Sequence, residues 1–211
     1  MHNKLQLIAL AALAGAGVAA QAQNHTIKFG VIRYDPHSRT SGITGIGIPP
    51  GADAEVGAAN TPLFTYEYLL APNWGIDFVL GIPPKIKARA TGSVAFLGEV
   101  LTARNVAPTV LLNYHFGQAG DTWRPYMGLG ANYTKFTNVT TPYAWNVKLG
   151  DSHGLAAHAG LDFNYSREFG LFASIGRANV RSKLVATGAA VLETTIDFRP
   201  WTYSFGASYR F

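Results

Sequence analysis

The sequence predicts an all-β fold, an eight-stranded antiparallel up-and-down transmembrane β-barrel with short periplasmic turns and longer external loops. The first observation is the alternation in residues 201–211, where odd positions are apolar and even positions are polar or small. The second is that this pattern recurs in eight segments along the chain. The third is that no run of about 18 apolar residues follows residue 22, so no membrane-spanning helix is expected there.

The N-terminal residues predict a signal peptide that is removed on export. Lys4 gives a positively charged start, residues 5–20 form an apolar run rich in Ala and Leu, and Ala20-Gln21-Ala22 fits an A-x-A cleavage site. A retained membrane anchor is the alternative, but the run is short for a bilayer and rich in small residues. We therefore expect residues 1–22 to be the signal peptide and residues 23–211 to form a single barrel domain.

Composition excludes several other classes of protein. The chain has no Cys, which argues against a disulfide scaffold in an exported protein and suits a closed hydrogen-bonded sheet. The net charge of +5 falls to +4 once Lys4 is removed, and the basic residues are scattered. A scattered basic excess predicts no nucleic-acid partner.

The first three predicted strands show clear alternation. They are residues 26–35, 62–70 and 74–82. In the third, large apolar residues at even positions oppose Gly, Asp and Val at odd positions, and Pro83-Pro84 ends the strand. Ala71-Pro72-Asn73 predicts a tight turn, whereas the Gly-, Pro- and Ala-rich residues 36–61 predict a long external loop.

The next three predicted strands are residues 107–117, 123–136 and 155–165. Gly128 and Gly130 fall on the inner face of the middle one, where a narrow barrel leaves little room for side chains. Short turns alternate with connections that we predict to be long loops, residues 84–106 and 137–154. A barrel of this size has a lumen that side chains nearly fill, so a wide aqueous pore is excluded.

The last two predicted strands, residues 169–185 and 191–211, are longer than a membrane requires. About twenty residues, tilted by about 40°, rise roughly 50 Å against an apolar band of about 25 Å. Beyond the band, the outward positions become charged and the inward positions apolar. The outward set includes Arg177, Arg181, Lys183, Asp197 and Arg199.

The inward apolar positions are the candidate ligand-binding residues of a hydrophobic lumen. They are Val180, Leu184, Leu192, Ile196 and Phe198. If the alternation continues through Pro200, they enclose a pocket suited to hydrophobic ligands and poorly suited to ions. The alternative is a β-bulge at Pro200, which would return Ile196 and Phe198 to the lipid face.

A second candidate set is charged and lies on the inner face near the periplasmic end. It consists of Lys28, Glu67, Asp77, Asp162 and Arg210. Because buried charges must be compensated, we expect these residues to form a paired polar network that closes this end of the barrel.

Other reactive side chains have simpler explanations. Asp151-Ser152-His153 resembles a nucleophile with its base, but adjacent residues rarely assemble that geometry. His115 and His158 could share a metal with Asp162, although satisfied lumen histidines are the favoured interpretation. We predict no catalytic site, no metal and no cofactor.

Several stretches resemble the outer membrane protein W (OmpW) family of Gram-negative bacteria, which includes alkane-import proteins. They are residues 89–92, 107–117, 124–134 with its Arg-Pro-Tyr-x-Gly-x-Gly-x-Asn-Tyr run, and 197–211 with its terminal Tyr-Arg-Phe. The resemblance implies an eight-stranded outer-membrane barrel with a hydrophobic channel, a lateral exit into the membrane and no catalytic site. Two departures concern the loops, since the second begins Pro83-Pro84-Lys85 and the third is short.

The resemblance and the predicted apolar lumen leave two candidate functions. The first is passive uptake of small hydrophobic molecules across the bacterial outer membrane through an apolar lumen. The alternative is a structural or surface-interaction barrel whose lumen is closed by packed side chains. The expected partners are outer-membrane lipid, the barrel-assembly machinery through Phe211, and lipopolysaccharide at Arg177, Arg181, Lys183 and Arg199. For this last surface, a solvated or loop-paired set of charges is the alternative.

Overall fold

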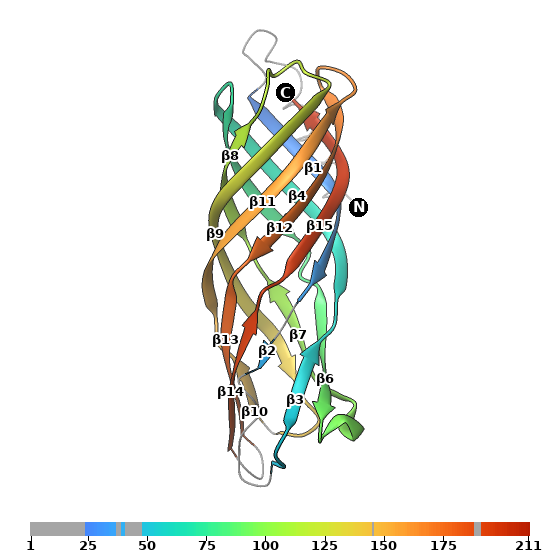
Figure 1. The fold of residues 1–211 in the computed structure, drawn as a ribbon, viewed down its shortest axis with the longest axis vertical. Helices are drawn as coiled ribbons and strands as arrows, with labels where there is room; N and C mark the ends of the chain where they lie inside the picture. Colours follow the sequence, from blue (N-terminus) through green and yellow to red (C-terminus); the bar gives the residue numbers. More distant parts are fainter. Residues whose placement is uncertain (1–23, 37–38, 41–47, 145, 188–190) are drawn as a thin grey trace, which may run out of the picture.

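The computed structural model describes residues 24–36, 39–40, 48–144, 146–187 and 191–211. The predicted signal peptide lies outside the described residues. The described chain forms one tall barrel (Figure 1), and its two ends differ. The end drawn at the top carries Phe211 and the short turns, and we call it the turn end. The opposite end carries the long connections, and we call it the loop end.

Eight antiparallel strands form the closed part, which we call the membrane barrel. They are β1 (His25–Asp35), β4 (Ala59–Ala71), β5 (Trp74–Gly81), β8 (Thr109–His115), β9 (Trp123–Thr140), β11 (Ser152–Asn164), β12 (Phe169–Ala178) and β15 (Trp201–Arg210). Each pairs with the next, and β15 pairs with β1 to close the sheet. The predicted eight-stranded up-and-down barrel is therefore confirmed.

The predicted long loops are largely strands, and here the sequence interpretation was wrong. The elements within the predicted loops are β2 (Arg39–Thr40), β3 (Ala52–Val56), β6 (Lys85–Gly92), the short helix η1 (Ala95–Leu97), β7 (Glu99–Val106) and β10 (Asn146–Leu149). Two more strands, β13 (Val180–Thr187) and β14 (Val191–Phe198), are the loop-end parts of the predicted strands 169–185 and 191–211. Together with the half of β9 that lies nearer the loop end, these elements continue the wall beyond the membrane barrel. We call this part the extension (Figure 1). The strands within the predicted loops were missed because their outward residues, such as Lys85 and Lys87, are charged and do not resemble a membrane strand.

Two sheets make up the wall of the extension. One continues from β9 through β7 and β6 to β3, and the other runs β10, β13, β14 and β2. No strand pairing joins these two sheets within the part of the chain that the structure describes. Among the described strands, the hydrogen-bonded closure of the membrane barrel therefore does not continue around the extension.

The outer surface of the membrane barrel is apolar. Large exposed hydrophobic side chains cover it, including Phe29, Phe78, Leu129, Leu155 and Phe205. In the extension, outward positions are charged instead, as at Lys85, Lys87 and Arg89 of β6. No helix in the described ranges is long and apolar enough to cross a bilayer. The exposed apolar side chains of the band lie on strands, as expected for a transmembrane barrel.

The alternation between inner and outer faces continues through Pro200. Arg177 pairs with Trp201 in the membrane barrel, and three residues further Val180 pairs with Phe198 in the extension. Both strands advance by the same number of residues, so no extra residue is inserted between them. Phe198 and Pro200 are both buried, while Arg199 between them is exposed. The β-bulge alternative at Pro200 is therefore excluded.

Close approach of backbones closes the barrel between β1 and β15. Gly30 and Gly206 are directly opposite each other in the register of these strands. A Cβ atom added at Gly30 would meet the carbonyl oxygen of Phe205 and lie 2.8 Å from the Cα of Gly206, well inside contact distance. The seam therefore requires a residue without a side chain at this point.

We expect Gly30→Ala to destabilise the barrel by about 1–3 kcal/mol, because the added methyl group must push two paired strands apart. The shift from folded to unfolded mobility on gels, followed against temperature in detergent, measures this loss. Gly120→Ala is the matched control, because nothing lies within 4 Å of its added Cβ atom. Equal midpoints for the two variants would contradict the role assigned to this seam.

Candidate functional site

The extension encloses an apolar cavity of about 340 Å³, which we call the chamber. Its wall comes from both sheets of the extension. The apolar side chains around it are Ile48, Val56, Ile86, Val94, Leu97, Val100, Leu101, Tyr143, Val147, Leu149, Leu184, Ile196 and Phe198, with several alanines. The chamber exists because the strands keep their period of two beyond the membrane band, so charged side chains turn outward and apolar ones inward.

Most of the predicted lumen residues lie in one buried cluster. Val180, Leu184, Ile196 and Phe198 are all buried and pack together. Leu184, Ile196 and Phe198 line the chamber. Val180 instead lines a second, smaller cavity, which lies inside the membrane barrel. The backbone of Leu192 lies in β14 opposite Ala186, and its side chain is outside the described part of the structure.

The sequence interpretation missed half of the chamber wall. The inward residues of β6 and β7, together with Val56, Phe136 and Leu149, belong to the same cluster. The signal was present, because Lys85, Lys87 and Arg89 alternate with small or apolar residues at 86, 88 and 90. Assigning this stretch to a loop concealed that alternation.

Two phenylalanines separate the chamber from the lumen of the membrane barrel. The rings of Phe136 and Phe198 lie 5.6 Å apart between centroids, and both side chains are buried. Phe198 lines the chamber, while its cross-strand partner Val180 lines the cavity below. We call Phe136, Val180 and Phe198 the apolar plug.

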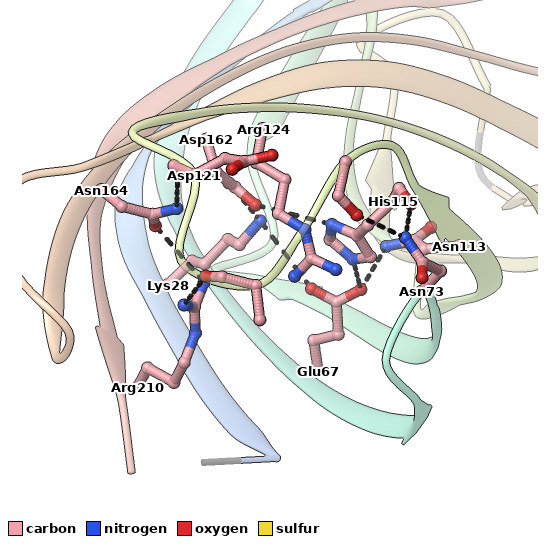
Figure 2. A network of polar contacts seen from close by, with 12 residues as sticks. Lys28, Glu67, Asn73, Asn113, His115, Asp121, Arg124, Asp162, Asn164 and Arg210 are labelled. Carbon is pink, nitrogen blue, oxygen red and sulfur yellow. Dashed lines mark hydrogen bonds and ion pairs between the residues drawn. The ribbon is translucent and has the colours of Figure 1, made fainter. Parts of the chain in front are cut away.

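A polar network fills the turn end of the lumen (Figure 2). Lys28 Nζ lies 2.7 Å from Asp162 Oδ1 and 3.9 Å from Glu67 Oε2. Glu67 Oε1 also accepts hydrogen bonds from Asn113 Nδ2 at 2.8 Å and His115 Nε2 at 2.6 Å. All five side chains are buried, so each charge is compensated by neighbours in place of water.

Both lumen histidines are engaged in this network. His158 Nε2 lies 2.7 Å from Asn113 Oδ1, and His115 Nδ1 lies 3.9 Å from Asp162 Oδ2. No group of three or more His, Cys, Asp or Glu side chains placed to hold a metal occurs in the described ranges. The geometry thus ties these histidines to Glu67 and Asn113 by hydrogen bonds.

The remaining two predicted network residues are placed differently. Asp77 is buried directly opposite Glu67 in the strand register, but it forms no ion pair with a described residue. Arg210 lies nearer the rim, where it donates to the carbonyl of Ala119 and to Asn164 Oδ1 (Figure 2). The structure therefore pairs Lys28 with Glu67 and Asp162, places Asp77 beside Glu67, and leaves both Asp77 and Arg210 outside the ion pairs among the described residues.

Arg124 is a buried cation that the sequence interpretation did not include. It is 1% exposed, lies opposite Asp162 in the register and donates to the carbonyl of Pro72. Its even position in the predicted alternating strand 123–136 places it inside the barrel, and this signal could have identified it. The ring of Tyr126 lies 4.4 Å from Lys28 Nζ, a cation–π contact that further shields this ammonium group.

The Asp151-Ser152-His153 sequence does not assemble as a catalytic group. Ser152 is buried inside the barrel, where its Oγ accepts a hydrogen bond from the backbone N–H of Arg181. His153 faces outward against the ring of Tyr133, and Asp151 accepts a hydrogen bond from the hydroxyl of that tyrosine. Strand alternation therefore sends Ser152 and His153 to opposite faces.

Comparisons with known proteins agree with this architecture. The chain is 29% identical over 216 residues to outer membrane protein W of Vibrio cholerae, covering 97% of each chain. It is 27% identical over 169 residues to outer membrane protein AlkL of Ectopseudomonas oleovorans, covering 79% of this chain and 73% of the relative.

A solved structure gives the same result for the fold. The crystal structure of the outer membrane protein OprG from Pseudomonas aeruginosa superposes with a TM-score of 0.81 at 26% identity, covering 90% of this chain and 99% of that one. The sequence profile of the OmpW family matches residues 21–211. With its closed barrel and relatives named as outer membrane proteins, the chain is an outer-membrane β-barrel and belongs to the OmpW family.

Proposed function

We propose that this protein is a passive outer-membrane channel that takes up small hydrophobic molecules, and that it acts by binding and release and not as an enzyme. The observation that carries the proposal is the chamber of about 340 Å³. It lies beyond the membrane band, and the outward side chains of its wall are charged. The inward apolar side chains do not fill this cavity with their own packing. A cavity with such a lining suits an apolar ligand. Val180, Leu184, Leu192, Ile196 and Phe198 are the ligand-binding residues of this proposal.

The polar network supports an exit other than the turn end. A hydrophobic molecule moving straight through the barrel would have to pass Lys28, Glu67 and Asp162, whose ion pairs occupy the lumen. Separating buried, paired charges is costly because each would be left uncompensated. We therefore propose that the cargo leaves sideways and that the network closes the periplasmic end.

The wall of the extension offers places for such a lateral exit. The strand assignments are interrupted between β12 and β13 at Asn179 and between β14 and β15 at Arg199-Pro200. The N–H of Asn179 still donates to the carbonyl of Leu155, and the carbonyl of Pro200 accepts from the N–H of Ala178. Pro200 has no N–H group to donate to a neighbouring strand. No strand pairing joins the two extension sheets among the described residues, so their facing edges are where the wall can part at low cost in hydrogen bonds.

We expect Phe198→Asp and Ile196→Asp to abolish uptake, because a carboxylate in the chamber replaces an apolar wall with a charge that needs water. The rate at which radiolabelled naphthalene accumulates in cells that depend on this channel measures the effect. Thr187→Asp is the control, since Thr187 is exposed on β13. Unchanged uptake in both chamber variants would favour the alternative, a structural or surface-interaction barrel with a closed lumen.

We expect Glu67→Ala to lower stability by about 3–5 kcal/mol, because it leaves Lys28 and His115 with fewer partners inside the barrel. Lys28→Ala should act in the same direction. Heat stability in detergent and ion leakage across planar bilayers measure the two parts of the proposal, stability and closure. The exposed Glu168 in a turn supplies the control Glu168→Ala. No change in either readout for both network variants would refute the closing role.

We further propose that the basic surface of the extension contacts lipopolysaccharide phosphates. Arg181 and Arg199 lie 3.6 Å and 2.8 Å from the carboxylate of Asp197, and Arg177 lies 5.1 Å from the ring of Trp201. The hydrogen bond from Arg199 holds the pKa of Asp197 below its ordinary value, so this acid stays charged and orients both guanidinium groups. Lys183 continues the same face.

We expect replacement of Arg177, Arg181, Lys183 and Arg199 by Gln to reduce the lipopolysaccharide that purifies with the protein severalfold, because charge-assisted hydrogen bonds to phosphate are lost. Quantifying lipopolysaccharide sugar per mole of protein measures this. Arg167→Gln, in a turn at the opposite end, is the control. Equal retention in all variants would favour a merely solvated surface.

Phe211 is the proposed contact with the barrel-assembly machinery. Its ring stacks on His25 at 5.4 Å and remains partly exposed, while its backbone exchanges hydrogen bonds with His25. The ring thus lies at the edge of the closing seam, where an assembly factor could reach it.

A further inference from the structure

A second cavity lies inside the membrane barrel, between the apolar plug and the polar network. Its volume is about 150 Å³, and its lining is mixed. Lys28 and Asp77 bound it toward the turn end, and Val180 and Pro200 bound it toward the plug. This cavity plays no part in the chamber described above, and neither the ion pairs nor the plug fills it.

Polar atoms without partners face this cavity. Asp77 Oδ1, Thr65 Oγ1 and Asn105 Oδ1 have no hydrogen-bond partner among the residues that the structure describes, and each of these residues is at most 4% exposed. Thr65 neighbours Asp77, but their contact does not reach hydrogen-bond geometry. A buried polar group left unsatisfied costs free energy, so these atoms favour an occupant that can bond with them.

The wall beside two of these atoms is apolar. Leu111 is directly opposite Asp77 in the strand register, Val79 is opposite Thr65, and Leu63 lies two residues before Thr65 on the same inner face. All three side chains line the cavity. The site therefore combines a hydrogen-bonding corner, Asp77 and Thr65, with an apolar wall.

We propose that this cavity is a binding site for a small neutral molecule that joins a hydroxyl group to an apolar body, such as a phenol or a short alcohol. The hydroxyl donates to Asp77 Oδ1 and accepts from Thr65 Oγ1, while the body packs on Leu63, Val79 and Leu111. A cavity of this volume accommodates a molecule of about the size of benzene. A pure hydrocarbon of the same size displaces water without replacing its hydrogen bonds.

This inference goes beyond the proposed uptake function, because it concerns a different cavity and a different chemical class. It rests on the proposed function only for the way a molecule reaches the cavity from outside. Binding to the purified protein can therefore succeed or fail independently of uptake in cells.

The test compares phenol with toluene, which has nearly the same shape but no hydroxyl group. The protein in lipid nanodiscs, with labelled Leu and Val methyl groups, is titrated with each probe, and methyl shifts of Leu63, Val79 and Leu111 report binding. We expect phenol to bind about tenfold or more tightly than toluene, the effect of one or more buried hydrogen bonds. Equal affinities, or phenol shifts confined to the chamber, would overturn the proposal.

Variants locate the hydroxyl contact. Thr65→Val preserves the shape of the side chain and removes its hydroxyl, so the preference for phenol over toluene should shrink several-fold. Ser174→Ala is the matched control, because Ser174 lines the same cavity but its hydroxyl already donates to Ser204 Oγ at 3.2 Å. A preference that survives Thr65→Val intact, or falls equally in Ser174→Ala, would also contradict the assignment.

Discussion

The constraint on which the whole structure depends is that lipid offers no hydrogen-bond partners to the backbone. Every N–H and C=O group of the membrane segments must therefore find its partner within the protein, which a closed sheet achieves. Closure between β1 and β15 in turn requires Gly30 and Gly206 to face each other, because a side chain there would hold the strands apart. The eight-stranded barrel is narrow, so its inner residues contact one another.

The same period of two produces three different interiors along one barrel. At the turn end, inward positions carry charges that are paired across strands, as in Lys28 with Asp162. In the middle, a small cavity keeps polar atoms beside apolar walls. Beyond the membrane band, the outer face becomes charged and the inner face becomes the apolar chamber. The backbone alternation is the same at every depth, and the chemistry of the lumen changes because the inward side chains differ.

The continuous register through Pro200 connects these levels. Because Arg177 pairs with Trp201 and Val180 with Phe198, the inward positions of β15 and β14 belong to one face. A single inserted residue would have placed Phe198 on the outside and opened the wall of the chamber. The apolar plug and the chamber therefore depend on the absence of a β-bulge at Pro200, although proline is a residue type that is found at bulges.

The sequence alone determined the class of fold, the eight membrane strands and which residues of each strand face inward, because alternation is a local property. It also placed Lys28, Glu67, Asp77 and Asp162 on the inner face. Only the tertiary structure decided which of them meet, since Lys28 and Asp162 are far apart in the chain and Arg210 proved to bond elsewhere. The tertiary structure likewise revealed β3, β6, β7 and β10 within the predicted loops and the chamber that they help to enclose, because pairing partners and enclosed volumes are set by strands from distant segments and not by any local pattern.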